Sequence, residues 1–480
     1  MSDQIGKIDF ATANLAWRRH VSRRGLLKAG AVVGALAAGI DQVPNVTWAA
    51  EKMARRASNS VAVRFMTTGG VGYQAYFKEA AAAFEKLHPE ISVQLEPTEG
   101  DFATKLKVEM AGGTAPDMVS GADDSNFSFA ARGTLHDLSS FWRASGRNAN
   151  DYWPNAWNPM WLGKQLISMP LDYGMWVFQY NKAIFDRAHL RYPDLSWTWD
   201  DFVRVLRKLT LDNKGRNPED PHFDPSHVVQ YGNDGGLNWS WNVLLRSQGL
   251  EWATPNLAKS RLDDPRVIEQ FQWIADLGNK YYVNPSPKFP SGVNWSIDSG
   301  NLATFFGGTW DIAEYVQHPQ FYNKQWDFTG YPKGKAGRAV VAECSGLIMP
   351  AQTSHPAETW KLMEFVTSEQ GLAMAHKYNV NLLNPYKSTS RRFLSKAATP
   401  PHAALILDLL PQSGLPFWCE AISDSELEGI LITSPWPDML RLYTGQESAK
   451  TVMPRVASNV NAILAADQVK AKQFGATLHL

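Results

Sequence analysis

Residues 61–96 read VAVRFMTTGGVGYQAYFKEAAAAFEKLHPEISVQLE, and this stretch decides the fold. Apolar residues alternate along 61–66 and predict a strand that ends in a Thr-Thr-Gly-Gly turn. Helical spacing of apolar residues follows over 73–87, until His88-Pro89 ends the helix. Alternation over 91–95 predicts a second strand. Two strands joined by a crossover helix form a parallel βαβ unit, so we expect an α/β protein.

The same organisation continues along the chain. Thr198 is positioned to cap a helix, Asp264-Pro265 opens another, and Ser354-His355-Pro356 opens a third. No internal repeat or low-complexity tract interrupts the alternation of strands and helices. A mature chain of about 430 residues exceeds what one hydrophobic core usually supports, so two lobes are expected.

The N-terminus has the parts of an export signal. Residues 22–28 read SRRGLLK, an uncharged run follows over 29–40, and small residues near 47–49 offer a cleavage site. A membrane-spanning helix needs roughly 20 apolar residues, and this run is shorter and stopped by Asp41. We therefore expect residues 1–49 to be a twin-arginine signal peptide and the mature protein to be periplasmic.

Composition narrows the classes of function. The chain has 47 Lys and Arg against 47 Asp and Glu, and loss of residues 1–49 leaves a net charge of about −3, so nothing favours nucleic acid. Aromatic residues make up 12%, and many of the 19 Trp stand beside Gly, Pro or Asn, which places a minority of them on loops as candidates for stacking on a ligand. Whether Cys344 and Cys419 pair is left open by the sequence.

Seven local patterns occur in a characteristic order. They are Phe84–Pro89 (FEKLHP), Ala111–Val119 (AGGTAPDMV), Gly133–Leu138 (GTLHDL), Met169-Pro170, Tyr180–Phe185 (YNKAIF), Trp197–Phe202 (WTWDDF) and Phe306–Trp310 (FGGTW). No single pattern is specific, but their shared order over residues 60–465 resembles the family 1 extracellular solute-binding proteins, the carbohydrate-binding receptors of ABC importers.

The resemblance implies a two-lobe clamp with several crossings between lobes. By family topology we expect 58–171 and 345–390 to form the N-terminal lobe, and 172–344 and 391–470 the C-terminal lobe. The crossings are expected near Pro170–Gly174, near Ala342–Gly346 and shortly after Lys387. The resemblance implies a monomeric receptor without catalytic residues or cofactor that captures a sugar or sugar derivative. Its expected partners are the permease subunits of an ABC transporter and the twin-arginine export machinery.

In open α/β sheets a ligand binds beyond the carboxyl ends of the strands, which points to loops after the predicted strands. Sugars need hydrogen-bonding groups for their hydroxyls and aromatic faces for their C–H surfaces. The candidate ligand-binding residues are Gly70, Gly72, Tyr73, Asp123, Asp124, Asp172, Tyr173, Trp239, Trp241, Trp310, Asp311, Glu343 and Trp436. Trp310 is the best stacking candidate and Trp436 the second, whereas core packing suits Trp239 and Trp241 equally well.

Local patterns in the sequence also bear on other functions. Gly70–Ala75 fits the G-x-G-x-x-A pattern with Glu96 at the end of the second strand, which is the fingerprint of an NAD(P)-dependent sugar oxidoreductase. The pair Asp123 and Asp124 also suits a polyamine, because carboxylates bind ammonium groups. Paired carboxylates such as Asp200 and Asp201 follow helical polar patterns, which indicate solvent-exposed helix faces rather than the active site of a hydrolase. The histidines and aspartates of 220–227 lack regular metal-ligand spacing, so no metal site is expected.

Overall fold

The computed structural model describes residues 60–98, 102–121, 126–289, 299–311, 325–378, 380, 383–394, 402–431 and 437–478. The expected signal segment 1–49 lies outside the described residues. Among the residues described, no helix combines the length and the apolarity that crossing a bilayer requires.

The strands are β1 (Val61–Thr67), β2 (Ile91–Pro97), β3 (Met118–Ser120), β4 (Trp161–Leu162), β5 (Gln165–Leu166), β6 (Met169–Asn181), β7 (Leu211–Asp212), β8 (Val228–Asn233), β9 (Leu302–Gly308), β10 (Trp326–Thr329) and β11 (Ala342–Ile348). The longer helices are α3 (Val71–Leu87), α4 (Phe102–Gly112), α9 (Trp199–Leu209), α10 (Leu237–Ser247), α11 (Pro265–Asn279), α14 (Pro356–Val366) and α20 (Ala449–Phe474). The shorter helices are α5 (Asn126–Ala131), α6 (Ser139–Ser145), α7 (Pro154–Trp157), α8 (Lys182–Arg187), α15 (Glu369–Ala375), α16 (Lys387–Leu394), α17 (Leu405–Leu409), α18 (Asp424–Leu431) and α19 (Pro437–Tyr443).

The expected βαβ unit is present. Strands β1 and β2 are parallel and in register from Val61 opposite Ile91 to Thr67 opposite Pro97, with α3 between them in the chain. Nine strands form one sheet in the order β2-β1-β3-β11-β6-β9-β8-β7, with β10 paired to β6. The α/β class is therefore confirmed.

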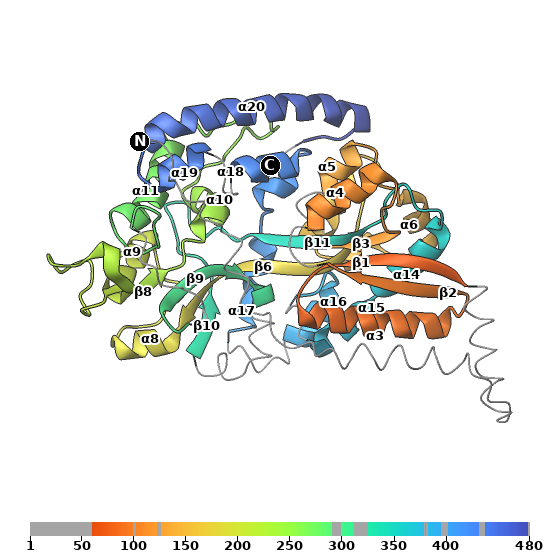
Figure 1. Cartoon of the computed structure of the whole chain (residues 1–480), viewed down its shortest axis with the longest axis horizontal. Coiled ribbons are helices and arrows are strands. Elements are labelled where there is room, and N and C mark those ends of the chain that lie inside the picture. The colour runs from red at the N-terminus through yellow and green to blue at the C-terminus, as the bar shows by residue number, and fades with distance from the viewer. Residues whose placement is uncertain are drawn as a thin grey trace, which may run out of the picture. The chain divides into compact units, whose positions relative to one another are not determined.

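Strand β6 belongs to both halves of the sheet. From Met169 to Met175 it pairs with β11, and from Trp176 to Tyr180 it pairs with β9. In Figure 1, β6 and β11 run through the middle, between one group of elements that holds β1, β2 and α3 and another that holds β8, β9 and α9. The two halves are thus joined by shared strands rather than by a loop.

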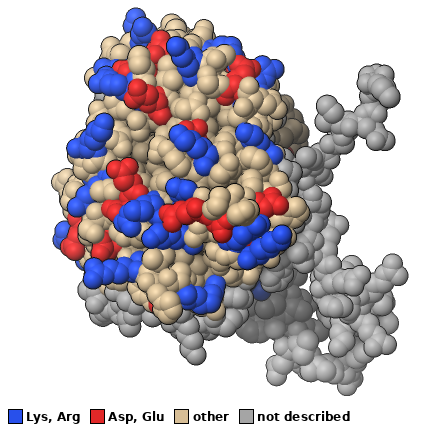
Figure 2. Space-filling view, turned by 90° about the vertical axis from the view of Figure 1, so that its left-hand side faces the viewer, with Lys and Arg blue, Asp and Glu red and all other residues tan. Residues whose placement is uncertain are grey.

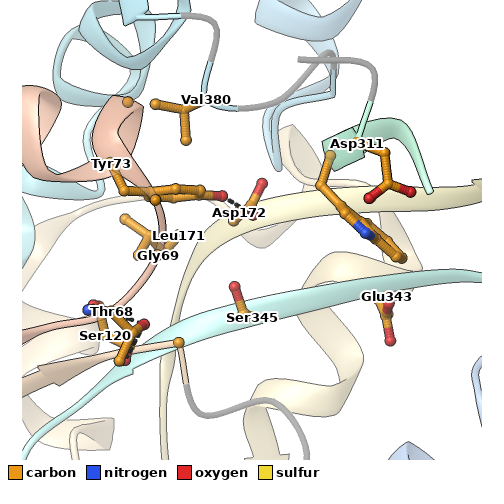
Figure 3. Close-up of a pocket in the computed structure, with 15 residues that line it drawn as sticks. Thr68, Gly69, Tyr73, Ser120, Leu171, Asp172, Asp311, Glu343, Ser345 and Val380 are labelled. Carbon is orange, nitrogen blue, oxygen red and sulfur yellow. Dashed lines mark hydrogen bonds between the residues drawn. The ribbon is translucent and has the colours of Figure 1, made fainter. Parts of the chain in front are cut away.

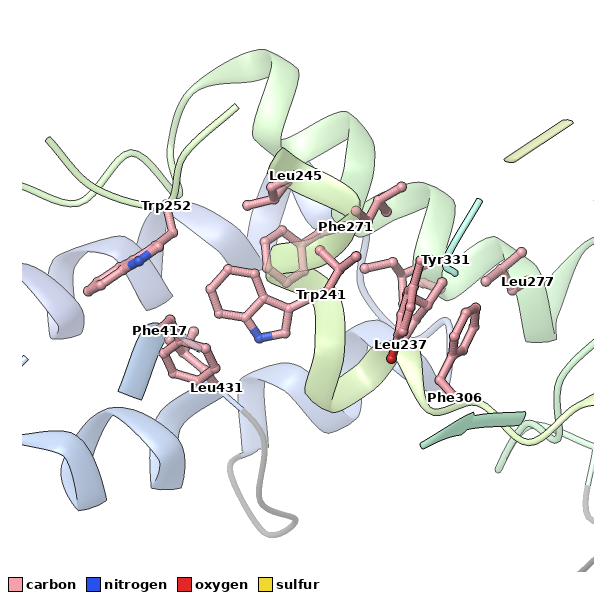
Figure 4. Packing of buried hydrophobic residues seen from close by; sticks show 14 of the residues in the cluster. Leu237, Trp241, Leu245, Trp252, Phe271, Leu277, Phe306, Tyr331, Phe417 and Leu431 are labelled. Atoms are coloured by element: carbon pink, nitrogen blue, oxygen red, sulfur yellow. The ribbon is translucent and has the colours of Figure 1, made fainter. Parts of the chain in front are cut away.

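Each half has its own hydrophobic core. The first core contains Phe65, Phe77 and Phe84 from β1 and α3. The second core contains Phe202, Trp241, Phe271 and Phe306, with Leu245, Trp252 and Tyr331 around them (Figure 4). Two separate cores are the arrangement expected of two lobes.

The chain passes between the cores more than once. Besides β6, the chain returns between β10, which pairs with the second half of β6, and β11, which pairs with β3 and the first half of β6. The chain then returns between Leu410, which packs in the first core, and Phe417, which packs in the second. The expected positions of the crossings and the lobe boundaries stay predictions.

Sequence-encoded caps set the helix starts. Thr198 and Asp201 form a reciprocal capping box at α9, and the Asp264 side chain accepts from the Arg266 amide at α11. Helix α14 begins at Pro356, whose missing N–H costs nothing in the first turn.

On the face shown in Figure 2, Lys and Arg side chains are interspersed with Asp and Glu side chains, so positive and negative charges are not separated there.

Candidate ligand-binding site

A cavity of about 440 Å³ opens where β6 and β11 pass between the two cores. Its walls come from the turn after β1, the end of β3, the middle of β6 and β11, and the turn after β9. The described lining residues are Thr68, Gly69, Gly70, Gly72, Tyr73, Ser120, Gly121, Leu171, Asp172, Gly174, Trp310, Asp311, Glu343, Ser345 and Val380. The cavity thus lies beyond the carboxyl ends of β1, β3 and β9, as the rule for open α/β sheets requires.

The first-lobe wall is built on the turn from β1 into α3. Gly69 has φ of +97°, a conformation that side chains other than glycine rarely adopt. Gly70 is the N-cap of α3 and makes no side-chain cap hydrogen bond. The backbone amides at a helix N-terminus, together with the helix dipole, favour an approaching oxygen atom.

Tyr73 and Asp172 join the first-lobe wall to β6. The Tyr73 hydroxyl donates a hydrogen bond to the Asp172 carboxylate, and both side chains lie on the same side of the cavity (Figure 3). The bond fixes the tyrosine ring and uses one carboxylate oxygen, Oδ2. The pair therefore presents a fixed ring and a charged acceptor at one wall.

The second-lobe wall is built on the turn after β9 and lies across the cavity, with Asp311 and Glu343 opposite Tyr73 (Figure 3). Asp311 Oδ2 accepts from the Gly308 amide at 2.8 Å and from Gln179 Nε2 at 3.1 Å. Glu343 Oε1 accepts from the indole N–H of Trp176 at 2.9 Å. These donors hold both carboxylates at β6, close to where it changes partner from β11 to β9.

The second-lobe wall has a negative electrostatic potential. Burial raises the pKa of Asp234 to about 7, the amides of Gly236 and Phe306 oppose the rise, and Asp311 adds to it. Burial raises the pKa of Tyr331, and the charges of Asp234, Asp311 and Glu343 raise it further. A site with this potential favours hydroxyl or ammonium donors over anions.

Seven of the sequence-predicted residues line this one cavity. They are Gly70, Gly72, Tyr73, Asp172, Trp310, Asp311 and Glu343. Asp123, Asp124 and Trp436 lie outside the described residues.

Three other candidates do not line the cavity. Tyr173 is buried in the first core and Trp241 in the second. Trp239 packs edge-on against Trp176 with ring centroids 4.6 Å apart. Tyr173 packs on the first-core side of β6, whereas Leu171 lines the cavity beside Asp172 at the irregularity in the β6–β11 register.

Eight lining residues are absent from the set named by the sequence analysis: Thr68, Gly69, Ser120, Gly121, Leu171, Gly174, Ser345 and Val380. Thr68 follows β1 directly and Ser120 ends β3, so strand ends carry the signal for these two, whereas Leu171 lies inside β6 beside Asp172. Within the part of the chain that the structure describes, no group of three or more His, Cys, Asp or Glu is arranged to hold a metal ion.

Comparison with known proteins identifies a family and solved structures that match most of the chain. The model of the bacterial extracellular solute-binding protein family matches residues 68–373. An ABC substrate-binding protein of Listeria monocytogenes in complex with cycloalternan superposes with a TM-score of 0.72 at 19% identity, covering 84% of this chain and 98% of that one. A solute-binding protein of Thermotoga lettingae bound with α-D-tagatose gives 0.70 at 20% identity, covering 84% and 100%. These likenesses show the two-lobe fold.

Curated relatives match over shorter spans. An uncharacterised extracellular-binding protein of an ABC transporter from Pyrococcus horikoshii is 23% identical over 308 residues, which is 61% of this chain and 65% of that protein. The melibiose/raffinose/stachyose-binding protein of Bacillus subtilis is 28% identical over 142 residues, 29% of this chain and 30% of that protein. The chain thus matches less than two thirds of the length of either relative.

Proposed function

The chain belongs to the bacterial extracellular solute-binding proteins, and from that membership we propose that it captures a sugar or sugar derivative in the cavity between its lobes and delivers it to the permease of an ABC importer. The observation that carries the proposal is the composition of the cavity. Carboxylates of Asp172, Asp311 and Glu343 and the rings of Tyr73 and Trp310 meet there from both lobes.

These groups match the two surfaces of a sugar. Hydrogen bonds from hydroxyls to charged acceptors contribute roughly 1.5–3 kcal/mol each, and an aromatic ring covers the apolar C–H face. The cavity volume of about 440 Å³ lies within the range of roughly 300–1,000 Å³ typical of small-molecule sites. A molecule held by both walls binds a closed arrangement better than an open one, which is how binding drives closure.

A thermal-shift screen across mono- and oligosaccharides, polyols and polyamines tests the proposal. Stoichiometric stabilisation by a sugar, without chemical change of the sugar, is the expected result. Polyamines belong in the screen because the negative wall at Asp311 and Glu343 also suits ammonium groups. Stabilisation by polyamines alone would replace the sugar by a cationic solute, and no stabilisation by any compound would overturn the proposal.

The alternative of a dinucleotide enzyme has less support. Glu96, the acidic residue of that fingerprint, accepts two hydrogen bonds from the Arg64 guanidinium, at 2.6 and 3.2 Å. The family and the matched structures are binding proteins. Incubation with NAD(P) and candidate sugars provides the check, since a change at the nicotinamide absorbance band would favour the oxidoreductase.

Export by the twin-arginine route to the periplasm, and action as a monomer, are part of the proposal. The export route rests on the sequence of residues 1–49, and the monomeric state rests on membership of the family. Replacement of Arg23 and Arg24 by Lys should retain the unprocessed protein inside the cell, as cell fractionation would measure. Normal export of that variant would contradict the twin-arginine assignment, and sedimentation of the mature chain would report its oligomeric state.

A further inference from the structure

The rings of Tyr73 and Trp310, which line the cavity, are supported in the same way. Each lies against the backbone of a nearby glycine, in the space that a Cβ atom would occupy. A methyl group added at Gly308 would overlap the indole of Trp310, and one added at Gly69 would come within 2.7 Å of the Tyr73 ring. Real Cβ contacts are longer than this, so a ring in this position requires glycine beneath it.

The turn that carries Trp310 is tied to β6 on both sides. Gly308 pairs with Trp176 in the β6–β9 ladder. The buried Thr309 accepts a hydrogen bond at its Oγ1 from the Met175 amide at 3.2 Å. Asp311 then accepts from the Gly308 amide, which closes the turn. The contacts of Gly308, Thr309 and Asp311 thus hold the chain on both sides of Trp310, whose indole lies over Gly308.

We propose that Gly308 and Gly69 are positioning residues that hold the rings of Trp310 and Tyr73 in one orientation before any ligand arrives. With glycine beneath it, each ring lies against the backbone while it also lines the cavity. Any larger residue pushes the ring off its support and into the cavity. A ring already ordered in the empty protein loses less conformational freedom when a ligand stacks on it. The identity of that ligand rests on the proposed function, but the positioning does not.

A ligand-free spectroscopic experiment tests the positioning. The protein is labelled with 5-fluorotryptophan, and the fluorine resonance of Trp310 is identified by its loss in Trp310→Phe. We expect one line in the wild type. In Gly308→Ala that line should move by more than its own width or split in two, because the indole loses its support. An unmoved, single Trp310 line in Gly308→Ala overturns the proposal.

Gly112→Ala is the matched control. Gly112 ends α4, and a methyl added there would lie 3.7 Å from Thr114 Oγ1, an ordinary contact. This variant should leave the Trp310 line unchanged. Should Gly308→Ala not fold, Gly69→Ala read through 3-fluorotyrosine at Tyr73 gives the same decision, with a moved line expected and an unmoved line fatal to the proposal.

A double-mutant cycle supplies an independent readout. Gly308→Ala should lower the melting temperature of the wild type, because the methyl group and the indole compete for one space. In Trp310→Ala that competition is gone, so the same glycine substitution should leave the melting temperature unchanged or raise it. Equal losses in both backgrounds would show that Gly308 acts on the fold and not on Trp310. Because no ligand is used, a failure here is distinct from a failure to bind sugar.

Discussion

Asp234 should make the stability of this protein depend on pH, and Asp234→Asn should remove that dependence. Asp234 follows β8, and its Oδ1 accepts from the Gly236 amide at 2.9 Å and the Phe306 amide at 3.4 Å. Burial, with Asp311 adding to it, raises its pKa from 3.8 to about 7. An asparagine keeps the accepting oxygen at this position and cannot ionise.

The sign follows from proton linkage. Between about pH 4 and pH 7 the unfolded chain has released this proton while the folded protein retains it, so the free energy of unfolding falls as pH rises through that window. Each pH unit is worth about 1.4 kcal/mol, and a shift of about three units gives an upper limit of about 4 kcal/mol. Asp234 keeps some contact with water, which reduces the effect, so we expect about 2–4 kcal/mol.

The assay is urea unfolding of the wild type and Asp234→Asn, followed by tryptophan fluorescence, at several values between about pH 4 and pH 8. The two proteins should differ little at the acid end, and the variant should be more stable at the alkaline end. Asp263→Asn, at an exposed position, is the control and should follow the wild type. A wild-type-minus-variant difference that is the same at both ends would refute the raised pKa of Asp234.

The remaining predictions concern binding, a buried ion pair and acid stability. Trp310→Ala should weaken the sugar found in the screen at least tenfold by calorimetric titration with the fold intact, and unchanged affinity would remove Trp310 from the site. Glu420→Gln should cost about 1–3 kcal/mol in urea unfolding, because it removes the nearer of the two carboxylates paired with the buried Arg246 guanidinium and leaves only Glu251, at 3.3 Å; a cost below about 1 kcal/mol would contradict this. Burial opposes ionisation of Asp212, yet Arg216 and backbone amides hold its pKa below the usual value. Its stabilisation is therefore present above about pH 4 and lost as pH falls further, a loss that melting curves of Asp212→Asn should not show.

The sequence predicted the α/β fold and named seven residues that the structure brings to one cavity, because both follow from local patterns. Alternation and helical spacing over 61–96 were enough to define β1, α3 and β2 and their parallel pairing. Tyr73 and Trp310 were named as candidates because they stand in or beside glycine-rich turns after strands, and both line the cavity. Each of these signals spans only a few residues of chain.

What the sequence did not predict depends on long-range packing. Trp241 follows two glycines and was a candidate for ligand stacking or for core packing, and the structure places it in the second core on helix α10. Tyr173 lies next to Asp172, and only the pairing of β6 with β11 decides which of the two faces the cavity. The packing of Ala403, Ile406 and Leu410 in the first core has no local signal, since β1 and α3, which help to form that core, are distant in sequence.

Strand β6 explains how two separate cores produce one site. Asp172, in its first half, takes the hydrogen bond of Tyr73 from the first-lobe wall. Gln179, in its second half, donates to Asp311 of the opposite wall, and the Met175 amide between them donates to Thr309. Both walls are therefore anchored to one continuous strand (Figure 1). We expect a dihedral change near Gly174 to turn one wall against the other, which would make the residues that contact a solute and those that allow the lobes to move neighbours in the same strand.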